Sequence, residues 1–353
     1  MATAEGLTIA VTGASGFIAT ELIHRLSADD RIGRILGFDV RPSSLSADKY
    51  VFDQLDVRNP KLEGRLGGAD ALVHLAFVMD PIKDESLMHD VNVAGSNNAF
   101  ACAAAAGVPR VVYTSSATVY GAHPDNDVPL TEDSPLRANL DFNYPAHKLE
   151  VEYLIREFRA EHPDIVFTNY RPAIVQGPHV DNAWSHFVEY PVLFGVKGYD
   201  PLFQFVHESD VARALVFALF NDLDGDYNVA PRGWLETDET LAIIGRTRTL
   251  LGEPAAFALM ERLWSIGLAE APAGILHYVM HPWVVSPARL EEAGVECAKS
   301  NSDTLTEAVE HMEGYVRLGR SRIRRKSLAR GAVAGSALAV ALALYGATRR
   351  LPA

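Results

Sequence analysis

The sequence predicts an α/β fold, in which a doubly wound parallel sheet is followed by a smaller, mostly helical lobe. Three observations support this. Short apolar runs alternate with amphipathic helical stretches through residues 7–170. A glycine-rich turn directly follows the first apolar run. After Pro172 the alternation ends, and aromatic residues, Pro and Gly become frequent. We therefore expect one unit over residues 1–172 and a second over 173–317, with segments of the second returning to the sheet.

The expected elements follow from the spacing of apolar residues. Strands are predicted at residues 7–11, 34–39, 50–56, 71–76, 110–115 and 165–170. Helices are predicted after the glycine turn and at residues 87–106, 145–160, 209–221, 237–251, 254–268 and 303–317. Strands that alternate with helices form βαβ units, which fixes a parallel sheet.

The turn Thr12-Gly13-Ala14-Ser15-Gly16-Phe17-Ile18-Ala19 lies between the first strand and its helix. Glycines there let the backbone approach a pyrophosphate, and the helix N-terminus offers N–H groups and a positive dipole end. Asp39 closes the second strand, where a carboxylate accepts hydrogen bonds from the adenosine ribose. The pattern predicts a Rossmann domain that binds NAD. NADP is disfavoured because Asp39 repels a 2′-phosphate, although Arg41 nearby is of the type that pairs with one.

Tyr144 and Lys148 lie four residues apart and share one face of a helix. The pKa of a free tyrosine is near 10, and a nearby ammonium together with an oxidised nicotinamide lowers it toward that of a usable base. Ser116, in a hydroxyl-rich stretch after the fifth strand, is suited to hold the reacting oxygen. These three residues are the predicted catalytic group, and no metal site is expected.

At this level the chain resembles the extended short-chain dehydrogenase/reductase family, which includes NAD-dependent epimerases, dehydratases and 3β-hydroxysteroid dehydrogenases. The matching motifs occur in order over about residues 7–317: TGASGFIA, Asp39, LDVRN, HLA, NVAGSNN, TSSATVYG, YPAHK, YRPAIVQGP and FVHESDVARA.

The resemblance implies a role for each matching residue. Tyr144 would be the general base and acid, Lys148 would lower its pKa and hold the nicotinamide ribose, and Ser116 would bind the substrate oxygen. Asp56 and Val57 would flank the adenine, Ala76 would line the pyrophosphate path, and Asn92 would order the active-site helix. Other matching residues would lie beside the nicotinamide (Arg171 and Pro172), anchor structure (His207 and Asp210) or face away on the helix (His147).

One departure from the family pattern leaves the class of substrate undetermined. Nucleotide-sugar epimerases often carry an Arg that grips the substrate diphosphate, and Phe203 stands at that position. This favours a lipid-like alcohol such as a 3β-hydroxysteroid or terpenoid, whereas the family at large favours a sugar nucleotide. Arg232, Arg246 and Arg248 are possible substitutes. Epimerase, dehydratase and dehydrogenase chemistry all remain open. A non-catalytic dinucleotide sensor or scaffold is the alternative of another class.

Charge is unevenly distributed. Nine of the 32 Lys and Arg lie from Arg317 onward, and all 45 Asp and Glu precede them. An acidic body argues against nucleic-acid binding. Cys102 and Cys297 are expected to be reduced thiols, and the N-terminus has no signal-peptide pattern.

The tail divides into a basic linker, 318–330, and an uncharged, Ala-rich run, 331–348. A helix over this run would approach the thickness of a bilayer, so we expect a single membrane anchor with the enzyme body in the cytoplasm. Gly331 and Gly335 are spaced for a close helix pair, which fits a homodimer. A helix packed on a partner, or a surface-lying or disordered tail, are the alternatives.

Overall fold

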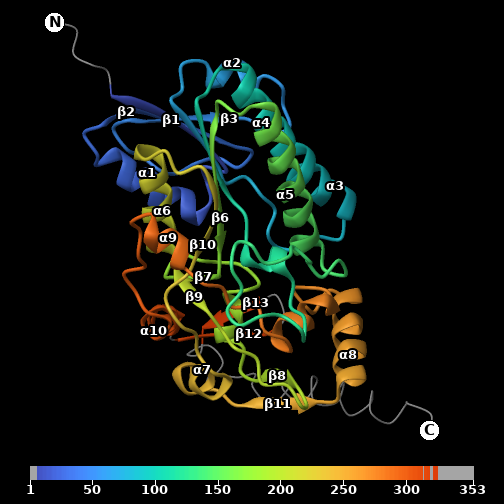
Figure 1. Cartoon of the computed structure of the whole chain (residues 1–353). Helices are drawn as coiled ribbons and strands as arrows, with labels where there is room; N and C mark the ends of the chain where they lie inside the picture. Colours follow the sequence, from blue (N-terminus) through green and yellow to red (C-terminus); the bar gives the residue numbers. More distant parts are fainter. Residues whose placement is uncertain (1–5, 313, 319–320, 325–353) are drawn as a thin grey trace, which may run out of the picture.

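The computed structural model describes residues 6–312, 314–318 and 321–324. A seven-stranded sheet forms the larger layer of the molecule, with strand order β10-β6-β5-β4-β1-β2-β3 (Figure 1). Every neighbouring pair in it is parallel. The strands are β1 (Leu7–Thr12), β2 (Ile32–Asp39), β3 (Tyr50–Gln54), β4 (Ala71–His74), β5 (Arg110–Thr114), β6 (Val166–Pro172) and β10 (Gly225–Val229). The predicted doubly wound sheet is confirmed.

The order of strands reverses between β1 and β4, which places a crevice for ligands at their carboxyl ends. Helices cover both faces (Figure 1). One face carries α1 (Phe17–Ser27) and α6 (Glu208–Phe220), and the other carries α2 (Leu62–Leu66), α4 (Gly95–Ala105) and α5 (Asn143–Glu161). Strands β1, β4 and β5 are buried along most of their length, because a parallel sheet covered on both faces has no solvent side.

The predicted helix over 87–106 is built from three pieces. It consists of α3 (Glu85–His89), a π-helical turn η1 (Asp90–Ala94) and α4. Asp84 caps α3, since its carboxylate accepts a hydrogen bond from the backbone of Leu87. The π-helical turn presents Asn92 inward, where it is fully buried. Such turns are frequent at functional sites.

The second lobe contains short elements below the sheet in Figure 1. Its two-stranded pairs are β7 (Ile174–Gln176) with β9 (Phe205–His207), β8 (Leu193–Val196) with β11 (Arg248–Leu251), and β12 (Tyr315–Leu318) with β13 (Ser321–Arg324). Its helices and turns are η3 (His186–Glu189), α7 (Thr237–Ile244), α8 (Glu253–Ser265), η4 (Ala273–Val279), α9 (Ala288–Glu292) and α10 (Asn301–Met312). A further turn, η2 (Ala117–Tyr120), follows β5.

Two element predictions in this lobe were wrong. The helix predicted over 237–251 stops at Ile244, because Gly245 takes a left-handed conformation (φ 64°), and residues 248–251 form β11 instead. The helix predicted to reach residue 317 ends at Met312, and β12 follows. β11 pairs with β8, and β12 pairs with β13; this pairing makes both segments strands instead of helix.

The hairpin β12–β13 lies across the predicted boundary at residue 317, and buried ions hold it to the lobe. The Arg317 guanidinium donates from Nε to Glu189 (3.0 Å) and from Nη1 to Glu270 (2.8 Å). Glu270 and Asp181 also bond His186. Burial lowers the pKa of His186, but these two hydrogen bonds outweigh burial and raise it above 6.5. The predicted linker 318–330 therefore begins inside a structured hairpin.

His207 and Asp210 lie where α6 begins. The His207 ring accepts a hydrogen bond from the backbone of Ser209 (3.1 Å), and Asp210 accepts from the backbone of Ala298 and Lys299. These contacts are structural, and they tie the chain before α10 to the helix that covers the sheet.

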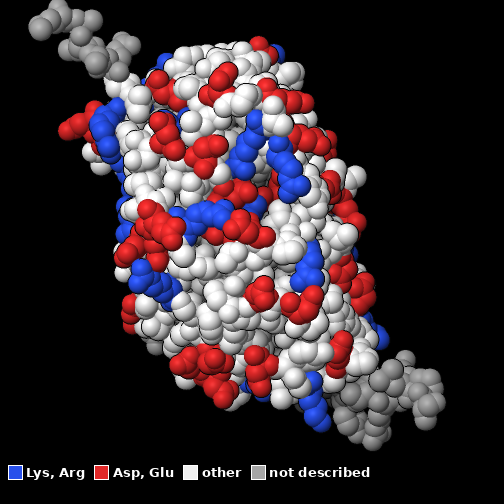
Figure 2. Space-filling model, viewed as in Figure 1, with Lys and Arg blue, Asp and Glu red and all other residues white. Residues whose placement is uncertain are grey.

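Acidic and basic side chains are mixed over the face shown in Figure 2, and acidic ones gather at the end formed by α7. The predicted membrane anchor, 331–348, lies outside the described residues, as does residue 325 onward of the predicted linker. Among the described residues, none of the helices combines the length and hydrophobicity needed to cross a membrane.

Candidate active site at the carboxyl edge of the sheet

The glycine turn joins β1 to α1 and meets the end of β4. Gly13 has φ 70°, and a Cβ placed on it would lie 2.6 Å from the backbone nitrogen of Ala76. Any side chain there would collide with main chain, which explains the glycine. Gly16 precedes α1 without a side-chain cap, so the N–H groups at Phe17 and Ile18 have no side-chain acceptor among the described residues. The arrangement fits a pyrophosphate at the helix N-terminus.

Asp39 ends β2 beside this turn. Its carboxylate accepts hydrogen bonds from the backbone of Ser15 (3.0 Å) and Arg41 (2.9 Å). The Ser15 hydroxyl donates to the Arg41 carbonyl, which ties the two loops together. The Arg41 guanidinium lies 3.6 Å from Asp39, so its charge is directed at that carboxylate. An acidic group at this place fits a ribose diol and repels a 2′-phosphate.

Asp56 and Val57 follow β3, the edge strand beside β2. Arg58 holds Asp56 through two hydrogen bonds, of 3.0 and 2.6 Å, and these lower the pKa of that carboxyl. Val57 is buried, and its carbonyl accepts from Asn98 at 2.7 Å. Their contact with an adenine stays a prediction.

The three predicted catalytic residues come from two elements at the same edge. Ser116 precedes η2, directly after β5, and its hydroxyl accepts from the backbone and the hydroxyl of Thr118. Tyr144 and Lys148 lie one turn apart near the start of α5. Their side chains are buried, at 5% and 4% exposed, which is unusual for a lysine and signals a specific role.

Lys148 is positioned by its surroundings. Its Nζ donates to the Thr114 carbonyl (2.7 Å) and to the Tyr113 hydroxyl (3.0 Å), and lies 3.7 Å from the centroid of the Phe77 ring. Burial keeps the pKa of Lys148 well below its usual range, while Glu152 acts in the opposite direction. Phe77 also packs edge-on against Tyr144, with ring centroids 5.8 Å apart.

In the protein alone, burial sets the pKa of Tyr144. Burial raises it to about 12, and a hydrogen bond with Ser116 acts against burial. Lys148 lies 6.0 Å from the Tyr144 ring centroid, and the predicted lowering of this pKa by Lys148 together with an oxidised nicotinamide stays a prediction. In the protein alone, the proton therefore stays on Tyr144 at neutral pH.

Arg171 and Pro172 end β6. The Arg171 side chain forms a two-pronged ion pair with Glu152, at 2.9 and 2.6 Å, and bonds the Tyr120 hydroxyl at 3.0 Å. The place of Arg171 beside the nicotinamide stays a prediction. Pro172 is buried at the strand end, and its place beside a cofactor stays a prediction.

Glu152 is the residue that the motifs did not single out. It lies on the same face of α5 as Tyr144 and Lys148, two turns beyond Tyr144. Its carboxylate also accepts from the Ser115 hydroxyl at 2.6 Å, so it positions the residue next to Ser116. The spacing of four along the helix was the signal that could have identified it.

Asn92 and His147 behave in part as expected. The Asn92 amide bonds both the N–H and the carbonyl of Val78 and lies 3.3 Å from the His147 ring, which links the loop after β4 to α5. His147 was expected to face away from the site, yet it is buried against Asn92. Burial lowers its pKa.

Comparisons with known proteins bear on the family to which the chain belongs. The sequence profile of the NAD dependent epimerase/dehydratase family matches residues 9–230. An uncharacterized protein of Mycobacterium tuberculosis is 31% identical over 247 residues, which span 67% of this chain and 66% of that protein. A UDP-glucose 4-epimerase of Mycolicibacterium smegmatis is 33% identical over 185 residues, or 48% of this chain and 57% of that one.

Solved structures share the fold. MoeE5 in complex with UDP-glucuronic acid and NAD has a TM-score of 0.70 at 21% identity, and the match covers 86% of this chain and 98% of that one. The UDP-glucose 4-epimerase of Thermus thermophilus in complex with NAD has a TM-score of 0.67 at 20% identity, with 87% and 99% covered. At these identities the likeness is one of fold.

The profile match extends over more than half of the chain and includes the glycine turn, Ser116, Tyr144 and Lys148. NAD as the cofactor and an enzymatic function agree with it. The chain belongs to the NAD-dependent epimerase/dehydratase family.

Proposed function

We propose that the protein catalyses NAD-dependent oxidation and reduction at a secondary alcohol or keto carbon, with Tyr144 as the general base and acid. The observation that carries the proposal is the convergence of Ser116, Tyr144 and Lys148 in one buried site at the edge where the strand order reverses. NAD, when bound, supplies the acceptor for the hydrogen and two electrons that the alcohol carbon gives up.

The chain's own residues perform the proton chemistry. Ser116 donates a hydrogen bond to the substrate oxygen and sets its distance from the Tyr144 hydroxyl. Tyr144 takes the hydroxyl proton as the carbonyl forms, and returns it in reverse. Because the pKa of Tyr144 stands at about 12 in the protein alone, with the Ser116 hydrogen bond already included, the positive ring of the oxidised cofactor would have to lower it further to favour the phenolate.

Lys148 has a fixed place in this scheme. The Thr114 carbonyl and the Tyr113 hydroxyl hold its ammonium beside the crevice, where a nicotinamide ribose is expected. Asp39 and the turn at Gly13 would hold the other end of the dinucleotide. A sensor or scaffold, the non-catalytic alternative, would not require a lysine buried between two aromatic rings, so this burial favours an enzyme.

The test is the Tyr144→Phe variant, with Tyr153→Phe as its control on the same helix. Tyr153 is 45% exposed and outside the site. With a 3β-hydroxysteroid as substrate the absorbance of NADH is followed, and with UDP-glucose the conversion to its 4-epimer is followed by chromatography, because epimerisation releases no NADH. Tyr144→Phe should lower the rate by about 10²-fold or more, and Tyr153→Phe should not. An unchanged rate in Tyr144→Phe, with an active wild type, would refute the proposed base.

A nucleotide-sugar epimerase is the second candidate, favoured by the mycobacterial relative that is a UDP-glucose 4-epimerase. An epimerase returns the hydrogen to the other face of a rotated keto intermediate, so its NAD stays bound. Cofactor retained through purification would favour this candidate, whereas NAD that exchanges freely would favour a dehydrogenase.

The proposal includes attachment of the enzyme body to a membrane through residues 331–348. The support is sequence alone: an uncharged run flanked by basic residues. The full chain should sediment with membranes, and a chain ending at Arg324 should not. Recovery of the full chain in the supernatant without detergent would refute the anchor, and with it the expected cytoplasmic orientation of the body.

A further inference from the structure

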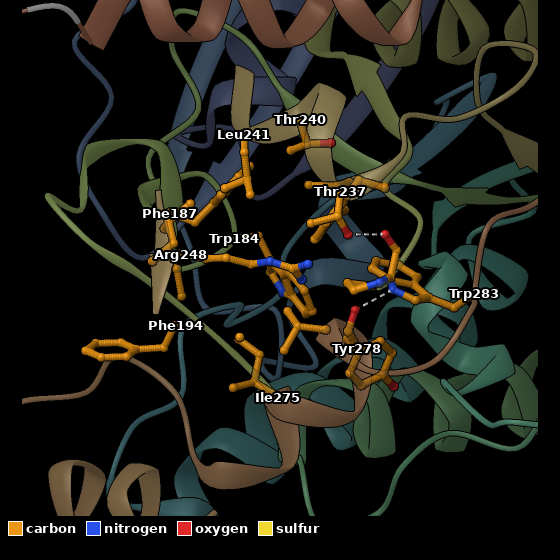
Figure 3. A pocket seen from close by; sticks show the side chains of 17 residues that line it. Trp184, Phe187, Phe194, Thr237, Thr240, Leu241, Arg248, Ile275, Tyr278 and Trp283 are labelled. Carbon is orange, nitrogen blue, oxygen red and sulfur yellow. Dashed lines mark hydrogen bonds between the residues drawn. The ribbon is translucent and has the colours of Figure 1, made fainter. Parts of the chain in front are cut away.

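A cavity of about 150 Å³ lies in the second lobe, between η3, β8, α7 and η4 (Figure 3). Aromatic and aliphatic side chains form most of its wall: Trp184, Phe187, Leu193, Ile275, Tyr278 and Trp283. A dry cavity of this volume accommodates about one six-membered ring. The proposed function leaves this cavity unused.

The polar groups in the wall already have partners. The Arg248 guanidinium is paired with Asp200 and donates to the Tyr199 carbonyl (3.3 Å). Thr237 donates its hydroxyl to the Pro201 carbonyl at 2.7 Å, and Thr240 donates to a backbone carbonyl of its own helix. Both Thr237 and Thr240 hydroxyls and both terminal nitrogens of Arg248 are thus engaged within the protein, so the described lining offers few donors for a diphosphate, which needs several.

The other candidate cations of the lobe are engaged as well. Arg232 pairs with Glu291 and Glu296, and Arg246 donates to the carbonyls of Tyr190 and Gly245. Phe203 stacks flat on Phe205, with ring centroids 6.2 Å apart, so it contributes an apolar surface. The chemistry of the cavity is that of a hydrocarbon site.

One aromatic ring, that of Phe142, lies between the cavity wall at Trp184 and the catalytic tyrosine. Trp184 packs on Phe142 with centroids 6.1 Å apart, and Phe142 packs on Tyr144 at 6.3 Å. The Tyr278 hydroxyl donates to the Thr118 carbonyl at 3.0 Å, in the same turn that Ser116 begins. The wall of the cavity and the catalytic loop are therefore fixed to each other.

The opposite end of the cavity reaches the surface at apolar residues. Phe194 lines the cavity and is 43% exposed, and Leu250, on the neighbouring strand β11, is 46% exposed. Such an exit suits a chain that continues beyond the cavity.

We infer that the substrate carries an apolar group that fills this cavity while its alcohol carbon lies at Ser116 and Tyr144. The inference rests on the proposed function and narrows it: the substrate is an amphiphilic secondary alcohol, recognised through its hydrocarbon part. Burial of each methylene in such a site raises affinity about fourfold until the cavity is full.

The test is a series of secondary alcohols from 2-butanol to 2-nonanol, with NAD and the full chain. We expect kcat/KM to rise about fourfold per methylene and then level off. Ala183→Phe fills the cavity and should level the series earlier, whereas Ala255→Phe, on the exposed side of α8, should not change it. A flat series together with turnover of UDP-glucose would overturn the inference and leave the proposed function standing.

Binding without turnover is measured separately. Trp184 and Trp283 both line the cavity, so their fluorescence should change when 2-heptanol enters, and Ala183→Phe should abolish the change. A fluorescence change without NADH formation would support the cavity site and count against the proposed reaction. Absence of both the change and the chain-length dependence would overturn the inference.

Discussion

The ion pair of Glu152 and Arg171 offers the sharpest test of how the catalytic edge is held. Both side chains are 3% exposed. One Glu152 oxygen accepts from Ser115 and from the Arg171 Nε, and the other accepts from Asn169 and from the Arg171 Nη2. In Glu152→Gln an NH₂ group replaces one of these oxygens. The two donors that were bonded to that oxygen then face another donor, and the Arg171 guanidinium loses its main counter-charge.

Removal of one partner from a buried pair costs about 3–5 kcal/mol. Asp226 remains 3.1 Å from the Arg171 Nη2 and is 27% exposed, so it offsets part of the loss. We therefore expect Glu152→Gln to lower the free energy of unfolding by about 3 kcal/mol, at the lower end of that range. Urea denaturation followed by circular dichroism measures it.

Glu150→Gln is the matched control, because Glu150 is on the same helix and pairs with His89 at the surface. An exposed pair contributes about 0–1 kcal/mol. The double variant Glu152→Met with Arg171→Met should recover most of the loss, since it leaves neither charge unpaired. If Glu152→Gln lies within about 1 kcal/mol of Glu150→Gln, the structural role assigned to this pair is wrong.

Three further predictions concern the glycine turn, Ser116 and the buried histidine that helps to hold the β12–β13 hairpin. Gly13→Ala should lower the affinity for NAD and should lower stability more than Gly68→Ala does. Both glycines have a positive φ, but of the two only Gly13 has main-chain atoms within 3 Å of the added Cβ. Isothermal titration compares the affinities and thermal melts compare the stabilities, and equal losses would contradict the steric argument. Ser116→Ala removes the hydrogen bond that lowers the pKa of Tyr144, so the rate at pH 7 should fall and the acidic limb of the kcat/KM profile should move to higher pH; an unmoved limb would separate Ser116 from the base. The pKa of His186 is raised in the folded protein, so its contribution to stability is complete below about pH 6.5 and is lost as the pH rises through the raised value. His186→Gln should therefore remove this pH dependence of stability in urea melts at pH 6 and 8. A pH dependence that persists in the variant would show that another group causes it.

The sheet could be predicted because each strand is marked locally. Apolar runs bounded by turns gave strands at 7–11, 110–115 and 165–170, and the structure extends or trims them by one or two residues. The glycine turn after the first strand and Asp39 at the end of the second were likewise located from the sequence, and the structure has them after β1 and at the end of β2. Those signals depend on residues that are close in sequence. Once the strands and helices are located, the connection rules of parallel βαβ units determine how they are arranged in the sheet.

The second lobe could not be predicted in the same way, because its strands pair at long range. Arg248–Leu251 pairs with a strand some fifty residues earlier, and its sequence has no alternation that sets it apart from a helix. The sequence predicts that the fold ends near Arg317, because a basic run begins there. Its burial depends on Glu189 and Glu270, which are distant in sequence.

In the site, the positions of Ser116, Tyr144 and Lys148 were anticipated, and the environment was not. The pKa of Tyr144 reflects burial among rings that include Phe77, which comes from the distant loop after β4. Arg171 was assigned from its place in a motif, whereas its partner Glu152 decides where it points.

The return of β10 to the sheet has a consequence for how this chain folds. Residues 225–229 form the edge strand beside β6, and α6 covers α1, although both follow the first part of the second lobe in sequence. The two lobes are thus interleaved along the chain. A fragment ending at residue 172 would lack an edge strand and leave an apolar helix face open to water, so neither half should be obtainable alone. Unfolding is expected to be a single cooperative event that takes the cofactor crevice and the cavity with it.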